Sequence, residues 1–436
     1  MHIHQFVPRY RPAVGGAEAY VGRLTDFLHA AGDAVTVWTS TAFDLGAMTG
    51  RGFREVEETS PPPPPLRSGE GEQDARFGSR SPLRRGGGGG EVSAVRRYAP
   101  LRFLGRRYVL KALSLVPHRR WQCLLRPSNP TCPGMWADAG THPGPVDAVH
   151  AFAFPHTFPA VCGLRLARRF DAPFLLTPFL HLGDPLDPRD RTRRQYTAPP
   201  LVWLLRQADT VFVQTPSEAD AVQRLGVPAG RVVLQGLGVD AAECTGGDRA
   251  AARAAWGVGP GERVVGHLAN NSVEKGTVDL LHAAGNLPGV RLVLAGPEMP
   301  NFRRAWDRSP HRGRVVRLGV LSDAGKRDFF AGLDLFALPS RTDSFGLVLL
   351  EAWANGVPVV AYRAGGPADL LRDGVDGRLV APGDLPGLAR AVVEAPPEWG
   401  EAGRQRVAAG FGWADKLQLV RDRLTSRPAR PPRRPG

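Results

Sequence analysis

The sequence predicts an α/β fold built from two Rossmann-like domains, each with a parallel sheet covered by helices. In both halves of the chain, short apolar runs alternate with stretches of helical periodicity. The apolar runs are continuous, which is typical of strands that are buried on both faces. A length of 436 residues is sufficient for two domains of ordinary size.

The first half begins with a strand and a helix. Residues 3–7 are expected to form a strand, and apolar side chains then recur at helical spacing through 15–32, where a glycine stops the pattern. Residues 61–90 are rich in Pro and Gly with almost no apolar content, so we expect a disordered insertion there. Residues 127–145 have the composition of a loop. The remaining strands of this half are expected at 34–39, 146–152, 172–179 and 210–215.

The second half repeats the alternation and contains a helix, from about Phe345 to Ala354, that is apolar almost all round. We expect a first domain at 1–240, a second at 248–408, a helix at 409–424 that returns to the first domain, and a flexible basic tail at 425–436. Strands of the second half are expected at 263–269, 290–296, 315–319, 333–340 and 358–362.

Composition limits the class of protein. Hydrophobic residues make up 42% of the chain and charged residues 22%, as in ordinary globular proteins. No run approaches the ~18 apolar residues of a membrane span, and the first residues lack the apolar core of a signal peptide. The four cysteines are scattered, without a C-x-x-C pair. We therefore expect a cytoplasmic protein with neither a disulfide framework nor a zinc site.

The net charge of +14 is unevenly distributed. Only four of the 56 basic residues are lysines, so the excess reflects GC-rich coding more than selection for a partner. No Asp or Glu occurs between Ser93 and Ala137, and the basic residues at 96–126 are interleaved with Leu, Phe, Tyr and Trp. Such a surface can lie on anionic lipid, although a solvated basic loop and helix explains it equally well. No stacking-aromatic signature accompanies the charge, so nucleic acid is not an expected partner.

Three glycine-containing turns, at Gly15–Gly16, Ser344–Phe345–Gly346 and Gly365–Gly366, lie between a strand and a helix. Such turns leave backbone N–H groups unpaired at a helix N-terminus, where the helix dipole also attracts anions. Lys275 is at the start of another expected helix, where the dipole disfavours a cation. We therefore expect phosphate binding, with Lys275 as a compact point charge.

Two carboxylates accompany the apolar helix. Glu351 lies in its middle, and Asp343 lies just before it. An ionised carboxylate is rarely buried without a partner. Asp343 has an alternative role as the N-cap of the helix, and the alternative for Glu351 is a buried ion pair with an arginine. Both are candidates for ligand binding.

The stretch "PSRTDSFGLVLLEAWANGVPVVAYRAGGPADLLRDGVDGRLV" resembles the retaining glycosyltransferases of family 4, in which two Rossmann-like domains face each other across a cleft in the GT-B fold. The resemblance extends, in the family's order, to "PRYRPAVGGAEAYVGRLTDFLHAAGDAVTVWTS", "TPSEADAVQRLGVPAGRVVLQGLGVD", "EKGTVDLLHAA" and "VRLVLAGPE". It implies that the first domain serves the acceptor and the second binds a nucleotide sugar.

The resemblance also implies roles for single residues. Glu351 would accept hydrogen bonds from the ribose hydroxyls of the donor, and Asp343 would hold hydroxyls of the donor sugar. The N–H groups of Phe345 and Gly346 would bind the diphosphate. His181, at a strand end, is similar to the family's histidine near the reacting carbon. The catalytic candidates are Asp343 and His181, and the donor-binding candidates are Lys275, Glu351, Ser344, Phe345, Gly346, Gly15, Gly16, His267, Gly365 and Gly366.

The chain departs from the family pattern at three positions. Asp343 and Asp369 stand where Glu is usual, and His267 stands where an arginine commonly lies beside the donor diphosphate. His267 is also two residues further from Lys275 than is usual. Since an error of ~1 Å in position can cost ~100-fold in rate, Asp343 implies either a displaced sugar or a longer reach by another group.

The implied reaction moves a sugar from a nucleoside diphosphate sugar to an acceptor hydroxyl, with retention, in envelope polysaccharide or glycolipid synthesis. We expect no essential metal, because Asp184, Asp187 and Asp190 are separated by prolines and do not form a dependable ligand set. Two alternatives stay open, namely a nucleotide-sugar epimerase of similar fold and a non-catalytic protein that binds a membrane surface. The sequence does not indicate the base, the sugar or the acceptor.

Overall fold

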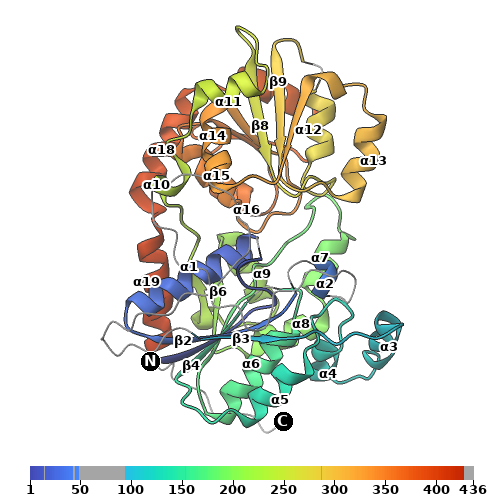
Figure 1. Cartoon of the computed structure of the whole chain (residues 1–436), viewed down its shortest axis with the longest axis vertical. Helices are drawn as coiled ribbons and strands as arrows, with labels where there is room; N and C mark the ends of the chain where they lie inside the picture. Colours follow the sequence, from blue (N-terminus) through green and yellow to red (C-terminus); the bar gives the residue numbers. More distant parts are fainter. Residues whose placement is uncertain (14, 43–44, 49–93, 153, 286, 427–436) are drawn as a thin grey trace, which may run out of the picture.

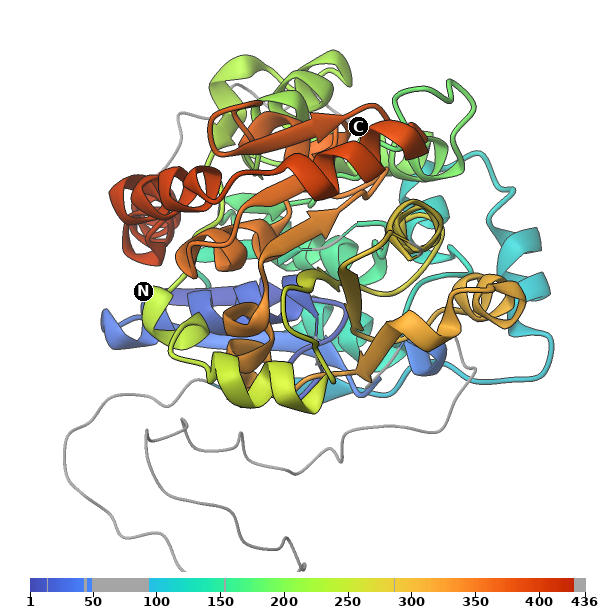
Figure 2. The ribbon, with the colours of Figure 1, turned by 90° about the horizontal axis from the view of Figure 1, so that it is seen from above.

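The computed structural model describes residues 1–13, 15–42, 45–48, 94–152, 154–285 and 287–426. The insertion expected at 61–90 and all but the first two residues of the expected tail at 425–436 lie outside this range. Two parallel sheets lie one above the other, with helices on their faces (Figures 1 and 2). The predicted α/β fold with two parallel-sheet domains is confirmed.

The N-terminal sheet has seven strands in the order β3-β2-β1-β4-β5-β6-β7. Two of them were not predicted. The strand at 94–98 lies at the sheet edge and contains two arginines, which hide the apolar pattern, and the strand at 232–234 has only three residues. The strands are β1 (His2–Phe6), β2 (Ala34–Ser40), β3 (Ala94–Tyr98), β4 (Ala148–Phe152), β5 (Phe174–Thr177), β6 (Thr210–Val213) and β7 (Val232–Leu234).

The C-terminal sheet has six strands in the order β10-β9-β8-β11-β12-β13. Its central strands are almost wholly buried, as their continuous apolar sequences predict. The strands are β8 (Arg263–Leu268), β9 (Val290–Ala295), β10 (Val315–Gly319), β11 (Leu335–Leu338), β12 (Val359–Tyr362) and β13 (Gly377–Val380), of which the last was not predicted.

Helices cover both faces of each sheet (Figure 1). Those of the N-terminal half are α1 (Gly16–Ala30), α2 (Leu45–Met48), α3 (Arg106–Leu113), α4 (Arg119–Leu124), α5 (Pro133–Thr141), α6 (Phe158–Arg169), α7 (Arg191–Tyr196), α8 (Pro199–Gln207) and α9 (Pro216–Arg224). The others are α10 (Ala241–Cys244), α11 (Arg249–Ala255), α12 (Thr277–Ala284), α13 (Pro300–Arg308), α14 (Asp323–Gly332), α15 (Leu347–Ala354), α16 (Gly365–Leu370), α17 (Leu385–Glu394), α18 (Glu398–Gly410) and α19 (Trp413–Thr425).

Two expectations about local structure were wrong. The segment 127–145 is not a continuous loop, because α5 begins with Pro133 in its first turn, where a missing N–H costs nothing. The apolar helix expected from Phe345 begins at Leu347, since Gly346 has a left-handed backbone and acts as its N-cap.

The chain crosses between the domains twice, and the two crossings touch. The N–H of Val239 donates to the carbonyl of Phe411 at 2.7 Å. After the second crossing, α19 packs beside α1 of the N-terminal domain, at the left of Figure 1. There the Nε of Arg421 lies 2.8 Å from the Oδ2 of Asp33. Among the helices of the described residues, none combines the length and apolar character that crossing a bilayer requires.

Candidate active site

The segment between β11 and α15 carries the two predicted carboxylates. Asp343 lies in the turn, and Glu351 lies on the second turn of α15. The turn needs glycine at position 346, where φ is +94° and a Cβ atom would be 2.9 Å from Leu349. The Asp343 and Glu351 side chains are each 16% exposed, so both are largely removed from water.

Lys275 reaches Asp343 from the loop between β8 and α12. Their Nζ and Oδ2 atoms are 2.7 Å apart. This approach depends on Gly276, where φ is +71° and a Cβ atom would be 1.8 Å from the carbonyl oxygen of Pro339. Burial would raise the pKa of Asp343, but the Lys275 ammonium outweighs it, helped by His181 and the Phe345 N–H, and holds the pKa below its ordinary value. Asp343 is therefore ionised at neutral pH.

Glu351 pairs with Lys326 of α14, which the sequence did not single out. The Nζ atom of Lys326 lies 2.5 Å from Oε1 of Glu351, whereas Oε2 is buried and has no hydrogen-bond partner among the described residues. Burial raises the pKa of Glu351, and Lys326 opposes this rise. The ion pair considered for Glu351 therefore exists, with a lysine instead of an arginine, and one carboxylate oxygen lacks a hydrogen-bond donor among the described residues.

Gly365 and Gly366 lie behind the Asp343 turn. A Cβ atom on Gly365 would be 2.3 Å from the carbonyl oxygen of Asp343, and one on Gly366 would be 2.3 Å from Cα of Phe345. The N–H of Gly366 already donates to the Asp343 carbonyl at 2.8 Å. Both glycines therefore support the turn that carries Ser344 and Phe345, and the Gly366 N–H is engaged within the domain and is not presented to an anion.

His267 also occupies a different place from the one predicted. It is fully buried in β8, with Nδ1 2.8 Å from the carbonyl of Ala337 and Nε2 2.9 Å from Oγ1 of Thr277. Burial lowers its pKa to about 4, so the ring is neutral. The expectation that His267 contacts the diphosphate is wrong for this arrangement, since both ring nitrogens are engaged inside the domain.

His181 reaches this site from the N-terminal domain. Its Nδ1 lies 2.9 Å from the carbonyl of Thr342, the residue before Asp343. Because a carbonyl only accepts, Nδ1 carries the proton and Nε2 is the unprotonated nitrogen. Burial first, and then the charge of Lys275, lower the pKa of His181, so the ring is neutral at pH 7. The structure thus brings His181, Asp343 and Lys275 together across the two domains.

Glu218 holds the segment before His181, although it was not among the residues predicted for the site. Its two carboxylate oxygens accept the N–H groups of Leu180 at 2.6 Å and Gln214 at 2.7 Å. Burial raises its pKa to about 7. The signal was present in the sequence as Thr215-x-x-Glu218, a capping box at the start of α9, where Oγ1 of Thr215 accepts the Glu218 N–H.

The Gly15–Gly16 turn starts α1, and a protein carboxylate already lies there. Glu18 turns back over Gly15, so a Cβ atom on that glycine would be 2.2 Å from its Oε2. Arg9 pairs with Glu18 at 2.6 Å. The sequence did not single out Arg9 and Glu18, which bring a cation and a carboxylate to the predicted anion site.

Two further contacts join the domains. Asp369 accepts from both the hydroxyl of Ser217, at 2.7 Å, and its N–H, at 2.9 Å. Arg341 pairs with Asp184 of the N-terminal domain at 3.2 Å and with Asp279 of α12 at 2.5 Å. Asp184 therefore takes part in an ion pair. Asp187 and Asp190 accept from nearby backbone N–H groups.

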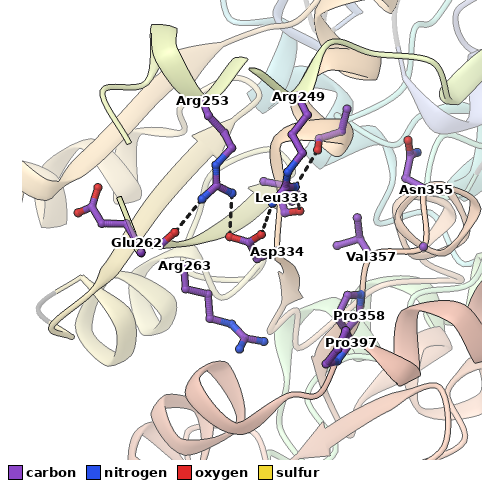
Figure 3. A pocket seen from close by; sticks show the side chains of 13 residues that line it. Arg249, Arg253, Glu262, Arg263, Leu333, Asp334, Asn355, Val357, Pro358 and Pro397 are labelled. Atoms are coloured by element: carbon purple, nitrogen blue, oxygen red, sulfur yellow. Dashed lines mark hydrogen bonds and ion pairs between the residues drawn. The ribbon is translucent and has the colours of Figure 1, made fainter. Parts of the chain in front are cut away.

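A cavity of about 660 Å³ lies elsewhere, at the amino ends of β8, β11 and β12. Figure 3 shows that Asp334 in its wall is already paired with Arg249 and Arg253. The predicted residues follow the carboxyl ends of the same strands, where ligands bind in open parallel sheets. This cavity is therefore at the opposite edge from the candidate site.

Two family models match the chain. Residues 15–238 match the glycosyl transferase 4-like domain, and residues 262–395 match the glycosyl transferases group 1. A D-inositol 3-phosphate glycosyltransferase of Mycolicibacterium gilvum is 35% identical over 226 residues, which are 49% of this chain and 51% of that protein. The Mycobacterium bovis protein of that name is 38% identical over 183 residues, 40% of this chain and 38% of its own. The chain thus spans about half or less of the length of these relatives.

Solved structures share the fold over nearly the whole chain. The Anabaena HepE protein, in complex with UDP and glucose, is 20% identical with a TM-score of 0.67, over 98% of this chain and 99% of its own. The sucrose-phosphate synthase of Thermosynechococcus elongatus is 22% identical with a TM-score of 0.66, over 97% of this chain and 98% of its own. The two facing parallel-sheet domains are those of the GT-B fold.

Proposed function

The chain belongs to the glycosyl transferases of group 1, of the family 4 type, and from this membership we propose that it moves a sugar from a nucleoside diphosphate sugar to an acceptor hydroxyl with retention. The observation that carries the proposal is the Glu351 carboxylate, with one oxygen paired to Lys326 and the other buried and without a hydrogen-bond partner in the described part of the chain. A ribose hydroxyl is a donor of the right kind for that oxygen. A hydrogen bond to a charged acceptor contributes roughly 1.5–3 kcal/mol.

The remaining residues supply the chemistry. Lys275 and the N–H groups at the start of α15 offer positive charge to a departing diphosphate, so the proposal requires no metal ion. Asp343 is ionised beside Lys275 and accepts hydroxyls of the donor sugar. His181 presents its unprotonated Nε2 from the acceptor side, and the leaving phosphate takes the proton of the incoming hydroxyl. The positioned charges favour the transition state, in which a sugar cation and a diphosphate separate.

The proposal fits the family models better than either alternative. An epimerase of similar architecture needs general acid and base carboxylates at the sugar C2, and Asp343 is already paired with a cation. A non-catalytic membrane-binding protein needs none of the paired carboxylates that lie at the carboxyl edge of the C-terminal sheet. Neither alternative is supported by the family models.

Calorimetric titration with UDP, GDP and ADP, without metal, tests the donor site. We expect one nucleotide to bind and its affinity to fall at least tenfold in Glu351→Ala and in Lys275→Ala. The matched controls are Glu401→Ala on α18 and Arg390→Ala on α17, which remove the same charges from exposed positions. If every nucleotide failed to bind, or the site and control variants bound equally well, the proposal would be wrong.

We propose that the acceptor side rests on an anionic membrane at the cytoplasmic face, where the acceptor is an envelope glycolipid or polysaccharide. Nine of the sixteen exposed large hydrophobic side chains among the described residues lie at 101–121. Leu104 is fully exposed, and Tyr108 and Leu115 are exposed by 78% and 77%. Basic residues lie between them without any acidic one, so charge and apolar surface favour the same partner.

Co-sedimentation with vesicles tests this contact. The double variant Leu104→Ser/Tyr108→Ser is expected to lose most of its binding to anionic vesicles, because apolar area that would enter the bilayer is removed. Leu186→Ser/Val320→Ser, which removes exposed apolar side chains elsewhere, is the control and is expected to bind as the unsubstituted protein does. Equal binding by all three proteins would contradict the membrane contact.

A further inference from the structure

A cavity of about 510 Å³ in the N-terminal domain is lined by α3, by the segment that contains α4 and by the start of α8. Two polar helix faces meet in it. Helix α3 and the residue after it contribute Arg107, Lys111 and Ser114, whereas the α4 segment contributes Arg119, Gln122 and Arg126. Within the helices these residues are spaced by three or four positions and so share one face, and Arg126 follows the end of α4.

The cavity gathers four cations that lack a counter-ion among the described residues. No acidic residue is among its described lining residues, and none of the four cations has a carboxylate partner in the described part of the chain. The Nε of Arg126 is buried and has no hydrogen-bond partner there. Four like charges around one hollow repel one another, and an anion placed among them would be stabilised by all four.

The same helix that lines the cavity carries the exposed apolar surface. Arg106 holds α3 in place, because its side chain donates to the carbonyl of Asn129 at 2.7 Å and to Oγ1 of Thr131 at 3.1 Å. With Arg106 and Leu110 turned inward, Arg107 and Lys111 line the cavity and Tyr108 is exposed. Helix α3 lies at the outer edge of the domain in both views (Figures 1 and 2).

The cavity also adjoins the edge of the sheet from which His181 extends. Ser128 lines the cavity, and its carbonyl accepts from Nδ1 of His156 at 2.8 Å. The neighbouring Asn129 accepts the N–H of Thr157 at 2.8 Å. His156 and Thr157 follow the carboxyl end of β4, and His181 follows that of β5, the adjacent strand. A ligand in the cavity is therefore on the acceptor side of the transfer site.

We propose that this cavity binds the phosphate group of an anionic lipid whose hydrocarbon part lies against the exposed apolar residues at 101–121. The inference rests on the proposed function and deepens it, since it assigns a phosphate-bearing lipid to the acceptor side. Three guanidinium groups and an ammonium around one hollow are the groups that phosphate recognition uses. The apolar surface beside them accounts for a lipid in preference to a free phosphate.

Vesicle binding distinguishes this site from general charge attraction. Phosphatidylcholine vesicles are made anionic with phosphatidic acid or, at matched surface charge, with oleate, which carries a carboxylate and no phosphate. We expect tighter binding to the phosphatidic acid vesicles. Lys111→Ala/Arg119→Ala is expected to weaken that binding about tenfold or more and to abolish the preference. Arg304→Ala/Arg390→Ala, which removes the same charge from exposed positions of the other domain, is expected to change it less than twofold.

Each alternative gives a different result. Equal binding of the unsubstituted protein to both anionic vesicles, or equal losses in the two double variants, would overturn the phosphate site. Calorimetric binding of inorganic phosphate, without any preference for phosphatidic acid vesicles, would overturn the lipid as its source. Titration of the same variants with the nucleotide that binds the unsubstituted protein checks that they are folded. A protein that binds its nucleotide but shows no vesicle preference refutes this inference alone, whereas failure of UDP, GDP and ADP alike to bind the unsubstituted protein refutes the donor site.

Discussion

At the scale of single residues, Lys326 decides the state of Glu351. Burial and the charges of Asp323 and Glu243 raise the pKa of this carboxylate, and Lys326 is the cation that opposes the rise. Cys244 also faces this pair, and burial raises the pKa of its thiol to about 12, so it is neutral. Since the charged form of Glu351 is the stronger acceptor, Lys326 acts as a positioning residue that keeps the carboxylate both ionised and oriented.

Replacing Lys326 therefore moves a pH profile. In Lys326→Met the pKa of Glu351 rises further. The ionised form is present above the pKa, so on lowering the pH the variant loses it at a higher pH than the unsubstituted protein does. We expect nucleotide affinity about tenfold weaker at neutral pH and a profile shifted upward, measured by titration calorimetry from pH 5 to 9. Lys326→Arg is expected to restore most of the affinity. An unshifted profile in Lys326→Met would show that Lys326 only fills space.

At the scale of elements, Gly276 allows the loop after β8 to cross Pro339 and deliver Lys275. In Gly276→Ala, the left-handed backbone alone costs ~1–2 kcal/mol, and the new Cβ atom meets the Pro339 carbonyl. We expect a larger loss of unfolding free energy than that, together with loss of nucleotide binding. Urea unfolding and calorimetry measure the two effects.

The matched control is Gly289→Ala. Gly289 has almost the same φ, +69°, but nothing lies within 4 Å of its added Cβ atom. It should lose only the ~1–2 kcal/mol of backbone strain and keep its nucleotide affinity. If both variants lost stability equally, the close approach to Pro339 would not be what requires glycine at 276.

Some elements of the fold could be predicted from the sequence and others could not. Strands β8, β9, β11 and β12 are largely apolar runs, so their burial was predictable. The carboxylates of Asp343 and Glu351 could also be singled out, because they lie before and within an apolar helix. Edge strand β3 was not predictable, because arginines interrupt it. Lys326 and Glu351 lie on different helices and are 25 residues apart in sequence, so nothing local indicates their pairing. The depth of His267 was missed for the same reason, since Thr277 and Ala337 become its neighbours only in the folded domain.

At the scale of the whole molecule, the site is divided between the domains. Lys275, Asp343, Lys326 and Glu351 belong to the C-terminal domain, and His181 belongs to the other. Nucleotide binding and sugar transfer therefore respond differently to changes at the contacts between the domains.

Asp369→Ala tests this division by removing both hydrogen bonds to Ser217. We expect nucleotide affinity to change less than twofold, while kcat/KM for transfer falls about 3- to 10-fold because the closed arrangement is less stable. Small-angle scattering should show a larger radius of gyration. Asp415→Ala, an exposed carboxylate on α19, is the control. Weaker nucleotide binding in Asp369→Ala would contradict the assignment of the donor groups to one domain.

The hydrogen bond between Val239 and Phe411 has a mechanical consequence. Both connections between the domains pass through this contact, so it marks the place of the hinge if the domains open. Fluorescent labels on β3 and β10, at the outer edges of the two sheets, would report such an opening as a change in the distance between them.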